Sequence, residues 1–356
     1  MAVSNVALPA VDRVRWVVGE VCTPVGSVRK VATFLSSADR WGAVRVRLGL
    51  GRMRYAVEPG LYAVGSPTEV SPVFVSANYK LSFDHLRREL QGIDGWIMVI
   101  DTKGINVWCA AGKGTFGTEE IVRRIDSTRL AEVVSHRRIV LPQLGAPGAA
   151  AHEVLHRSSF RVIYGPVRAR DIPEFLDAGR KASREMRRVR FNMGDRLVLV
   201  PTELVQWGPY ALAVAAGLFL LSGLSRTGYT FPGMAGGRVA LLFLAAFLAG
   251  GVLVPAFLPW LPGRALSWKG MVVGLLLAAV LAIVGLIPSA GIAGRLETAA
   301  WLLLMPAVCA FMAMNFTGST TYTSISGVEK EMRFAVPLQC IAAALGTALW
   351  MLARFF

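Results

Sequence analysis

The segment from Asp101 to Glu120 holds a single cysteine, Cys109, among glycines at positions 104, 112, 114 and 117. Glycine lets the backbone approach a large ligand closely. The segment fits neither the GxGxxG pattern nor the Walker A pattern, so it carries no nucleotide-binding signature. A cysteine in this setting has three possible roles: a buried structural thiol, a nucleophile or a metal ligand.

The other cysteines and the histidines leave these three roles open. The chain has 4 cysteines, and no two of them form a CxxC pair, so neither a zinc knuckle nor a self-contained iron–sulfur site is indicated. A cysteine nucleophile needs a paired base, and no signature links Cys109 to the histidines downstream of it, which are His136, His152 and His156. From residue types alone, a structural thiol is the commonest role.

Predicted strands and helices alternate around this segment. A buried strand of β-branched residues at 97–101 ends where the segment begins. This alternation favours an α/β domain with a Rossmann-like layered, mainly parallel sheet. Ligands of such sheets bind at the carboxyl ends of the strands, which is where residues 101–117 would lie. We predict further strands at 105–108, 133–141 and 161–164, a hairpin over 41–57, and helices over 118–125, 147–157 and 171–179.

The second half of the chain differs from the first in composition. The mean hydropathy is +0.50 and 54% of the residues are hydrophobic, which is high for a soluble protein. A shift near residue 196 predicts a soluble domain over 1–196 and an all-α transmembrane domain over 197–356. Runs without Asp, Glu, Lys or Arg, each close to the roughly 20 residues of a spanning helix, predict five spans, near 204–224, 239–261, 270–290, 298–316 and 335–353.

Charge predicts the orientation in the membrane. The net charge is +15, which alone would also fit a nucleic-acid-binding protein. However, the densest basic run flanks the first predicted span, where the positive-inside rule places cytoplasmic residues and where anionic lipids attract them. Because no signal peptide opens the chain, we predict a multi-pass protein of the cytoplasmic (inner) membrane, with its soluble domain in the cytoplasm, lipid contacts and no nucleic-acid partner. The basic run is Arg180, Lys181, Arg184, Arg187, Arg188, Arg190 and Arg196.

A hydroxyl-rich segment, 317–334, is predicted to be a loop on the same side of the membrane as the soluble domain. It is either a solvated connector or a surface that packs against that domain or its ligand. No charge embedded in the predicted spans suggests a proton relay or substrate path, which weighs against a transporter.

The motif around Cys109 resembles a known family. Residues 106–113 read Asn-Val-Trp-Cys-Ala-Ala-Gly-Lys, which is similar to the cap-helix motif of the mercury-methylation corrinoid proteins, the HgcA family. Residues 72–84 resemble the large subunit of the corrinoid iron–sulfur protein of the acetyl-CoA pathway. The predicted multi-span half resembles the HgcA family and not this soluble relative.

The resemblance implies a cofactor and a set of residues that bind it. It implies a cobalamin held base-off, with Cys109 as the lower axial ligand to cobalt. Small residues in the motif would allow a flat macrocycle to lie against the helix. The implied cofactor-binding residues are Asn106, Val107, Trp108, Cys109, Ala110, Ala111, Gly112, Lys113, Gly114 and Thr115.

The resemblance also implies a reaction and partners. The activity would be a corrinoid-dependent methyl transfer to Hg(II), which forms methylmercury. A thiolate opposite the methyl group is a strong electron donor, and it would favour departure of methyl as a carbanion equivalent to a soft electrophile. The implied partners are a reducing ferredoxin with two iron–sulfur clusters, HgcB, and an upstream methyl donor linked to methyltetrahydrofolate. The alternatives are a corrinoid methyl carrier of one-carbon metabolism with another acceptor, and a B12-binding or transport protein.

Overall fold

Two strands buried along their whole length form the centre of the first half of the chain. In the computed structural model, which describes residues 15–316 and 325–356, every residue of β4 (Val73–Ala77) and of β5 (Gly95–Ile100) is buried. The two strands pair in parallel, with Val73 opposite Trp96. Their β-branched and aromatic residues suit strands that are covered on both faces.

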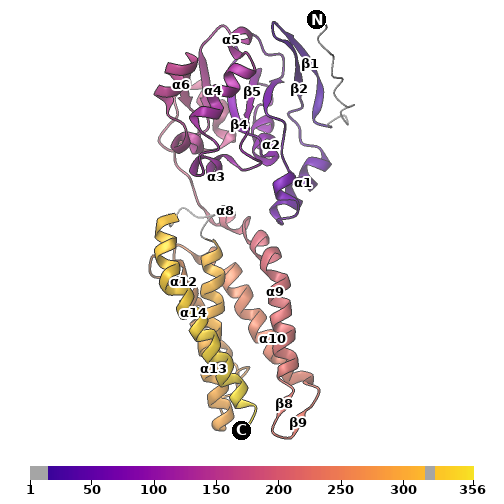
Figure 1. Cartoon of the computed structure of the whole chain (residues 1–356), viewed down its shortest axis with the longest axis vertical. Helices are drawn as coiled ribbons and strands as arrows, with labels where there is room; N and C mark the ends of the chain where they lie inside the picture. Colours follow the sequence, from indigo (N-terminus) through magenta and orange to yellow (C-terminus); the bar gives the residue numbers. More distant parts are fainter. Residues whose placement is uncertain (1–14, 317–324) are drawn as a thin grey trace, which may run out of the picture. The chain divides into compact units, whose positions relative to one another are not determined.

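These strands lie within a seven-stranded mixed sheet with the order β1-β2-β3-β5-β4-β6-β7. The pairs β1–β2 and β3–β5 are antiparallel, whereas the remaining pairs are parallel. The predicted α/β layered architecture is therefore confirmed (Figure 1). The other strands are β1 (Val17–Thr23), β2 (Gly26–Val31), β3 (Gly60–Val64), β6 (Arg138–Leu141) and β7 (Arg161–Tyr164).

Helices and short 3-10 turns cover both faces of this sheet. Alternate residues of β5 enter different cores: Met98 packs with residues of α3 and α4, and Ile97 packs with residues of α2 and α7. The helices are α1 (Ser37–Arg47), α2 (Lys80–Glu89), α3 (Val107–Gly112), α4 (Thr118–Ser127), α5 (Leu130–Val133), α6 (Ala151–Ser158) and α7 (Ile172–Asp177). The 3-10 turns are η1 (Arg52–Arg54), η2 (Gln143–Gly148) and η3 (Ala169–Asp171).

Two predictions of strand structure are wrong, and capping side chains explain both. The hairpin predicted over 41–57 is instead helix α1 followed by η1. Ser36 and Asp39 form a capping box, in which each side chain accepts a hydrogen bond from the other residue's backbone N–H, at 3.0 and 3.2 Å. The strand predicted at 105–108 is the start of α3, which Asn106 caps.

The chain folds as two compact units, the first made of Met1–Val46 and Leu50–Val189 and the second of Arg47–Gly49 and Arg190–Phe356. The second unit contains five helices that are long and apolar enough to cross a membrane, as predicted. These candidate spans are Met193–Leu221, Gly233–Phe257, Leu266–Ile283, Gly291–Asn315 and Gly327–Ala353. The elements are α8 (Met193–Leu197), α9 (Val200–Leu221), β8 (Leu224–Ser225), β9 (Gly228–Tyr229), α10 (Gly233–Leu248), the π-helix η4 (Ala249–Leu253), α11 (Val254–Phe257), α12 (Leu266–Ile283), α13 (Gly291–Asn315) and α14 (Ile325–Ala353).

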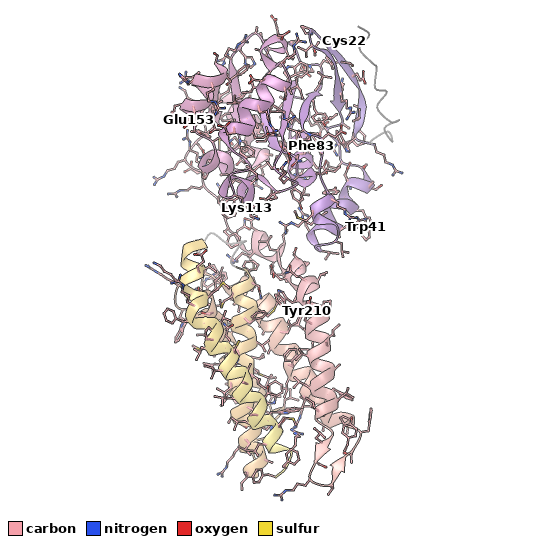
Figure 2. All side chains as sticks on the ribbon, in the orientation of Figure 1. Cys22, Trp41, Phe83, Lys113, Glu153 and Tyr210 are labelled. Carbon is pink, nitrogen blue, oxygen red and sulfur yellow. The ribbon has the colours of Figure 1, made fainter. Side chains whose placement is uncertain are left out.

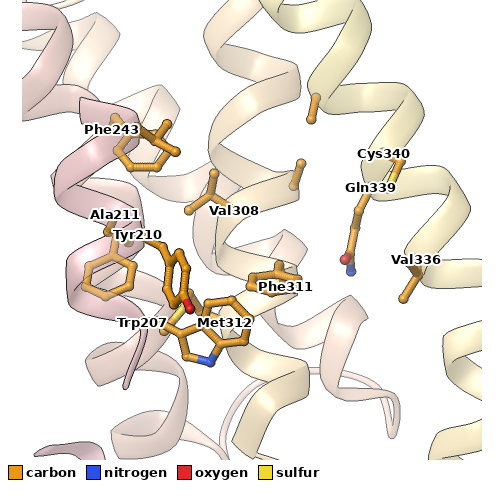
Figure 3. A pocket seen from close by; sticks show the side chains of 14 residues that line it. Trp207, Tyr210, Ala211, Phe243, Val308, Phe311, Met312, Val336, Gln339 and Cys340 are labelled. Atoms are coloured by element: carbon orange, nitrogen blue, oxygen red, sulfur yellow. The ribbon is translucent and has the colours of Figure 1, made fainter. Parts of the chain in front are cut away.

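Glycines allow close contacts within this helical unit. A β-carbon added to Gly270 of α12 would lie 2.6 Å from the Cα of Ala310 in α13. One added to Gly274 would lie 2.5 Å from the Cα of Pro306, also in α13. Such approach of backbones is typical of helix packing in lipid. An apolar cavity of about 350 Å³ lies between α9, α10, α13 and α14, where the rings of Trp207 and Phe311 meet edge to face at 4.9 Å (Figure 3).

The candidate spans are longer than the predicted apolar windows, and buried charges lie just outside those windows. Lys269 of α12 is 4% exposed and its Nζ donates to the carbonyl oxygen of Leu258 at 2.9 Å. Glu297 of α13 accepts hydrogen bonds from Arg238 and Arg354, each at 2.9 Å. Each charge lies within the first or last turns of its helix, because the helices extend beyond the apolar windows. They therefore do not line a path across the unit.

The predicted loop over 317–334 is only partly described. Residues 317–324 lie outside the described residues, so the proposed surface there is not addressed by the structure. Residues 325–334 belong to α14 and are helical, which corrects the loop prediction for this part.

Candidate functional site

Asn106 begins the short helix that carries Cys109. The Asn106 side-chain Oδ1 accepts a hydrogen bond from the backbone N–H of Cys109 at 2.9 Å, and Asn106 itself has extended backbone angles. Asparagine is among the best N-cap residues because its side chain satisfies one of the otherwise free N–H groups of the first turn. The cap therefore fixes the backbone at the cysteine itself.

The loop before α3 is held from a neighbouring strand by Asn78. Asn78 lies directly after β4 and is 7% exposed. Its Oδ1 accepts hydrogen bonds from the backbone N–H groups of Thr102 and Gly104, at 3.1 and 3.0 Å, and lies 2.8 Å from the Thr102 hydroxyl. Its Nδ2 donates to Asp101 Oδ1 at 3.3 Å. Asn78 thus joins the carboxyl end of β4 to the loop that leaves β5.

An ionic group supports the first residue of this loop. Glu120 of α4 accepts a hydrogen bond from the backbone N–H of Asp101 at 2.9 Å and another from Arg124 at 2.8 Å. Burial raises the pKa of Glu120, but these hydrogen bonds outweigh burial and lower the pKa overall. A hydrogen bond from Lys103 lowers the pKa of Asp101. Both carboxylates are consequently ionised at neutral pH, which keeps Glu120 an acceptor for the loop.

The far end of α3 packs against η2, the turn that follows β6. A β-carbon added to Gly148 would lie 2.1 Å from the carbonyl oxygen of Phe116 and 3.0 Å from the Cα of Ala111. One added to Gly145 would lie 2.5 Å from the Phe116 ring, which is fully buried. Gly114 ends the helix in the left-handed region, with φ 78°. Backbone contact, rather than a large side chain, therefore fixes the distance between α3 and η2.

The topology of the sheet places α3 at a switch point. β4 and β6 are neighbours in the sheet. After β4 the chain continues to β5, on the side of β4 away from β6, and after β6 it continues to β7, on the side of β6 away from β4. Loops after neighbouring strands that lead in opposite directions form the crevice in which α/β sheets bind ligands. Because α3 packs against both η2 and β4, it lies at this crevice, at the carboxyl ends of the parallel strands.

The motif residues divide between two sides of α3. Val107, Ala110 and Ala111 are buried and belong to the core of the sheet domain. Packing against the sheet and η2 therefore accounts for the small size of Ala110 and Ala111. The residues left accessible are Trp108 (39% exposed), Gly112, Lys113 and Gly114, together with the half-buried Asn106, Cys109 and Thr115.

The thiol of Cys109 differs from a structural thiol in this same chain. Cys309 is fully buried and its Sγ donates a hydrogen bond to the carbonyl oxygen of Ala246 at 3.1 Å. Within the described residues, the Cys109 Sγ makes no hydrogen bond, and the residue is half-buried. A thiol that is accessible and not hydrogen-bonded can serve as a ligand or a nucleophile.

The ten residues predicted from sequence lie at the N-cap of α3, on α3 itself and on the turn after it. Sequence reasoning missed Asn78 and Gly148, which position that helix from other parts of the chain. The signal for Asn78 was its place directly after a buried strand, where a polar residue can hold a loop. Gly148 gave no comparable signal.

We expect Asn106→Ala to loosen α3 without unfolding the domain. Loss of an asparagine cap costs about 1 kcal/mol, so amide hydrogen exchange over residues 107–113 should become roughly five times faster. Asn106→Ser should retain most of the protection, because serine also caps helices. Unchanged exchange in Asn106→Ala would contradict a capping role.

Comparison with known proteins places residues 51–176 in a family. They match the family model described as CdhD, the CO dehydrogenase/acetyl-CoA synthase delta subunit. The gamma subunit of the acetyl-CoA decarbonylase/synthase complex of Methanopyrus kandleri is 36% identical over 123 residues, which are 34% of this chain and 26% of that protein. Its counterpart in Archaeoglobus fulgidus is 32% identical over 123 residues, with the same coverage of 34% and 26%.

The chain thus spans about a quarter of the length of the curated relatives it matches. The matched residues include β4, β5, α3 and η2, and so contain every element that positions Cys109. Neither the first strands nor the helical unit falls within the match. The α/β unit of this chain contains a CdhD-family domain, homologous to the gamma subunits of acetyl-CoA decarbonylase/synthase complexes.

Proposed function

We propose that the α/β unit binds a corrinoid base-off at α3, with the Cys109 thiolate as the lower axial ligand to cobalt. One observation carries the proposal: an accessible thiol that makes no hydrogen bond within the described residues stands on a capped helix at the switch point of a CdhD-family domain. The resemblance of residues 106–113 to the HgcA motif supports the same assignment.

The accessible side of α3 fits a flat macrocycle. Apart from the adjacent residues and the backbone of α3 itself, no heavy atom of the described residues lies within 4 Å of a β-carbon added to Gly112 or Gly114, so the surface next to Cys109 is open there. Trp108 contributes an exposed aromatic side chain, and Lys113 supplies a donor for a peripheral amide of the corrin. We assign contact with the cofactor to this accessible set, and support of the helix to Val107, Ala110 and Ala111.

A bound corrinoid would supply a cobalt-carried methyl group. In this proposal the chain positions the Cys109 sulfur and holds it as a thiolate. Asn106 fixes the backbone of Cys109, and contacts with η2 keep α3 in place. A metal cation favours the thiolate form of a coordinating cysteine. The Cys109 thiolate would donate electron density to the bound group, which would favour release of its methyl group with the electron pair.

This polarity of transfer suits Hg(II), a soft electrophile, and we propose that the acceptor is Hg(II) and the product methylmercury. A separate reductant would restore the cofactor, and we propose the small ferredoxin HgcB for this role. A methyl donor linked to methyltetrahydrofolate would reload it. The five candidate spans, with the boundary near residue 196, would anchor the domain on the cytoplasmic side of the inner membrane.

The homologues favour a second candidate, a membrane-anchored methyl carrier with another acceptor. They are named as subunits of a complex that acts on acetyl-CoA, so a partner protein could take the methyl group. That acceptor would be a nucleophile, which takes the methyl group without its electron pair, and electron donation from Cys109 would not favour such a transfer.

Product analysis separates the two candidates. The full chain, loaded with isotopically labelled methylcobalamin, is incubated with Hg(II) in one sample and without it in another. We expect labelled methylmercury in proportion to bound cofactor, and retention of the label when Hg(II) is absent. Cofactor binding without any methylmercury would exclude the mercury acceptor and leave the carrier function.

A further inference from the structure

Helix α1 and the turn after it present apolar and basic side chains together on the surface. Trp41 is 70% exposed, Val44 42%, Leu50 51% and Met53 69%. Figure 2 shows Trp41 on the outer side of α1. Between these residues stand the exposed arginines Arg40, Arg45, Arg52 and Arg54. We call this set of eight side chains the α1 surface.

A buried ionic network fixes α1 with this surface outward. Asp39, on the inner side of α1, is 8% exposed and lies 2.6 Å from Lys80 Nζ and 2.9 Å from the fully buried Arg87. Burial raises the pKa of Asp39, but hydrogen bonds from Lys80 and Ser36 outweigh burial and lower the pKa to about 2. Asp39 is therefore ionised and paired at neutral pH, so the outward orientation of Trp41 is set by the fold.

The positive charge of the α1 surface favours an anionic partner. Residues 40–54 contain five arginines and no Asp or Glu, so the segment is strongly cationic. An arginine-rich polar side combined with exposed tryptophan and aliphatic residues is the composition of helices that lie in a membrane interface. Tryptophan in particular prefers the level of the lipid headgroups.

We propose that the α1 surface binds the anionic headgroup layer of the membrane that the helical unit spans. A lipid surface fits better than an acidic protein, because the five candidate spans in the same chain would tether the α/β unit to a bilayer and make its contact with lipid intramolecular. Attraction to anionic lipid amounts to about fivefold in binding for each arginine near the surface. The proposal does not depend on the corrinoid assignment.

The α1 surface adjoins the loop that leads to Cys109. The backbone N–H of Lys80 donates to the carbonyl oxygen of Tyr55 at 3.0 Å, which ties the turn after α1 to the end of β4. On the other side, a β-carbon added to Gly104 would lie 3.4 Å from the carbonyl oxygen of Met53. Lipid contact at Met53 would therefore occur at the same edge of the sheet as the candidate site.

Hydrogen exchange of the full chain in nanodiscs tests the proposal. One set of discs contains phosphatidylcholine alone, and the other an equal mixture of phosphatidylcholine and phosphatidylglycerol. We expect amides of residues 40–54 to exchange at least about fivefold more slowly in the anionic discs, whereas α6 (Ala151–Ser158) should exchange equally in both. Arg52→Gln/Arg54→Gln and Trp41→Ser should each weaken the protection of residues 40–54 in the anionic discs. Both variants should fold, because the three side chains are exposed.

A matched control removes two arginines elsewhere. Arg138 and Arg161 are exposed at the amino ends of β6 and β7, where they face each other across the strand pair, and Arg138→Gln/Arg161→Gln should leave the protection of residues 40–54 intact. Equal exchange in the two disc types would overturn the proposal, as would protection that Arg52→Gln/Arg54→Gln leaves undiminished. Protection that arises only when an acidic protein is added would overturn it too, and would assign the surface to a protein partner.

Discussion

Cys109→Ala is expected to remove the cobalt–thiolate absorption of the cobalamin-loaded protein and to stop methylmercury formation. Loss of a residue that only supports a metal site costs roughly 10- to 100-fold in affinity or activity, so loss of the axial ligand itself should exceed that range. The visible spectrum of the loaded chain and a methylmercury assay provide the two measurements.

The unloaded Cys109→Ala protein should keep its stability. Cys109 is half-buried, makes no side-chain hydrogen bond within the described residues, and alanine is the better helix former, so the change should stay within about 0.5 kcal/mol. Cys22→Ala is the matched control, because Cys22 is exposed on β1; it should leave both spectrum and activity unaltered. A Cys109→Ala protein that retains the thiolate spectrum would show that another group binds cobalt.

Gly148→Ala is expected to disrupt the site without touching the cofactor. Its β-carbon would collide with the carbonyl oxygen of Phe116, at 2.1 Å, and with the Cα of Ala111, at 3.0 Å. Backbone atoms cannot rotate away as a side chain can, so α3 must shift, at a cost of about 3 kcal/mol. Thermal unfolding of the α/β unit and titration with cobalamin should both show the loss.

Gly112→Ala provides the contrasting variant on the same helix. Its added β-carbon would meet no described residue outside its own helix within 4 Å, so the unloaded protein should be as stable as the parent or slightly more so. Cobalamin affinity should nevertheless fall, because the new methyl group stands on the side assigned to the macrocycle. If Gly112→Ala bound cobalamin normally, the corrin would have to contact another surface of α3.

Local patterns predicted some elements well and others poorly. The strands at 97–101 and 161–164 are confirmed as β5 and β7, because short runs of buried β-branched residues have few alternatives. In the segment around Val44, alternation of valine and arginine suggested a strand. The capping box of Ser36 and Asp39 favours a helix instead, and this signal lies before the alternating residues.

The candidate site was predictable only as far as its residues are neighbours in sequence. Cys109 and its motif occupy one continuous stretch, and the strand before it indicated the carboxyl end of a sheet. Asn78 and Gly148 act across 26 and 37 residues, respectively, counted to Gly104 and Ala111. Such contacts depend on strand order, which a single sequence does not specify. The small size of Ala110 and Ala111 was assigned to the cofactor, yet packing already requires it.

Helix α3 spans only six residues, Val107–Gly112, and isolated helices shorter than about 12 residues are marginal in water. The motif around Cys109 therefore does not fold into this helix on its own. A peptide of this sequence, or the same letters grafted onto a different scaffold, would lack the acceptor from β4 and the glycine backbone of η2. The smallest unit that can be transferred to another protein is the assembly of β4, β5, α3 and η2. The motif found outside that assembly is weak evidence for the same site.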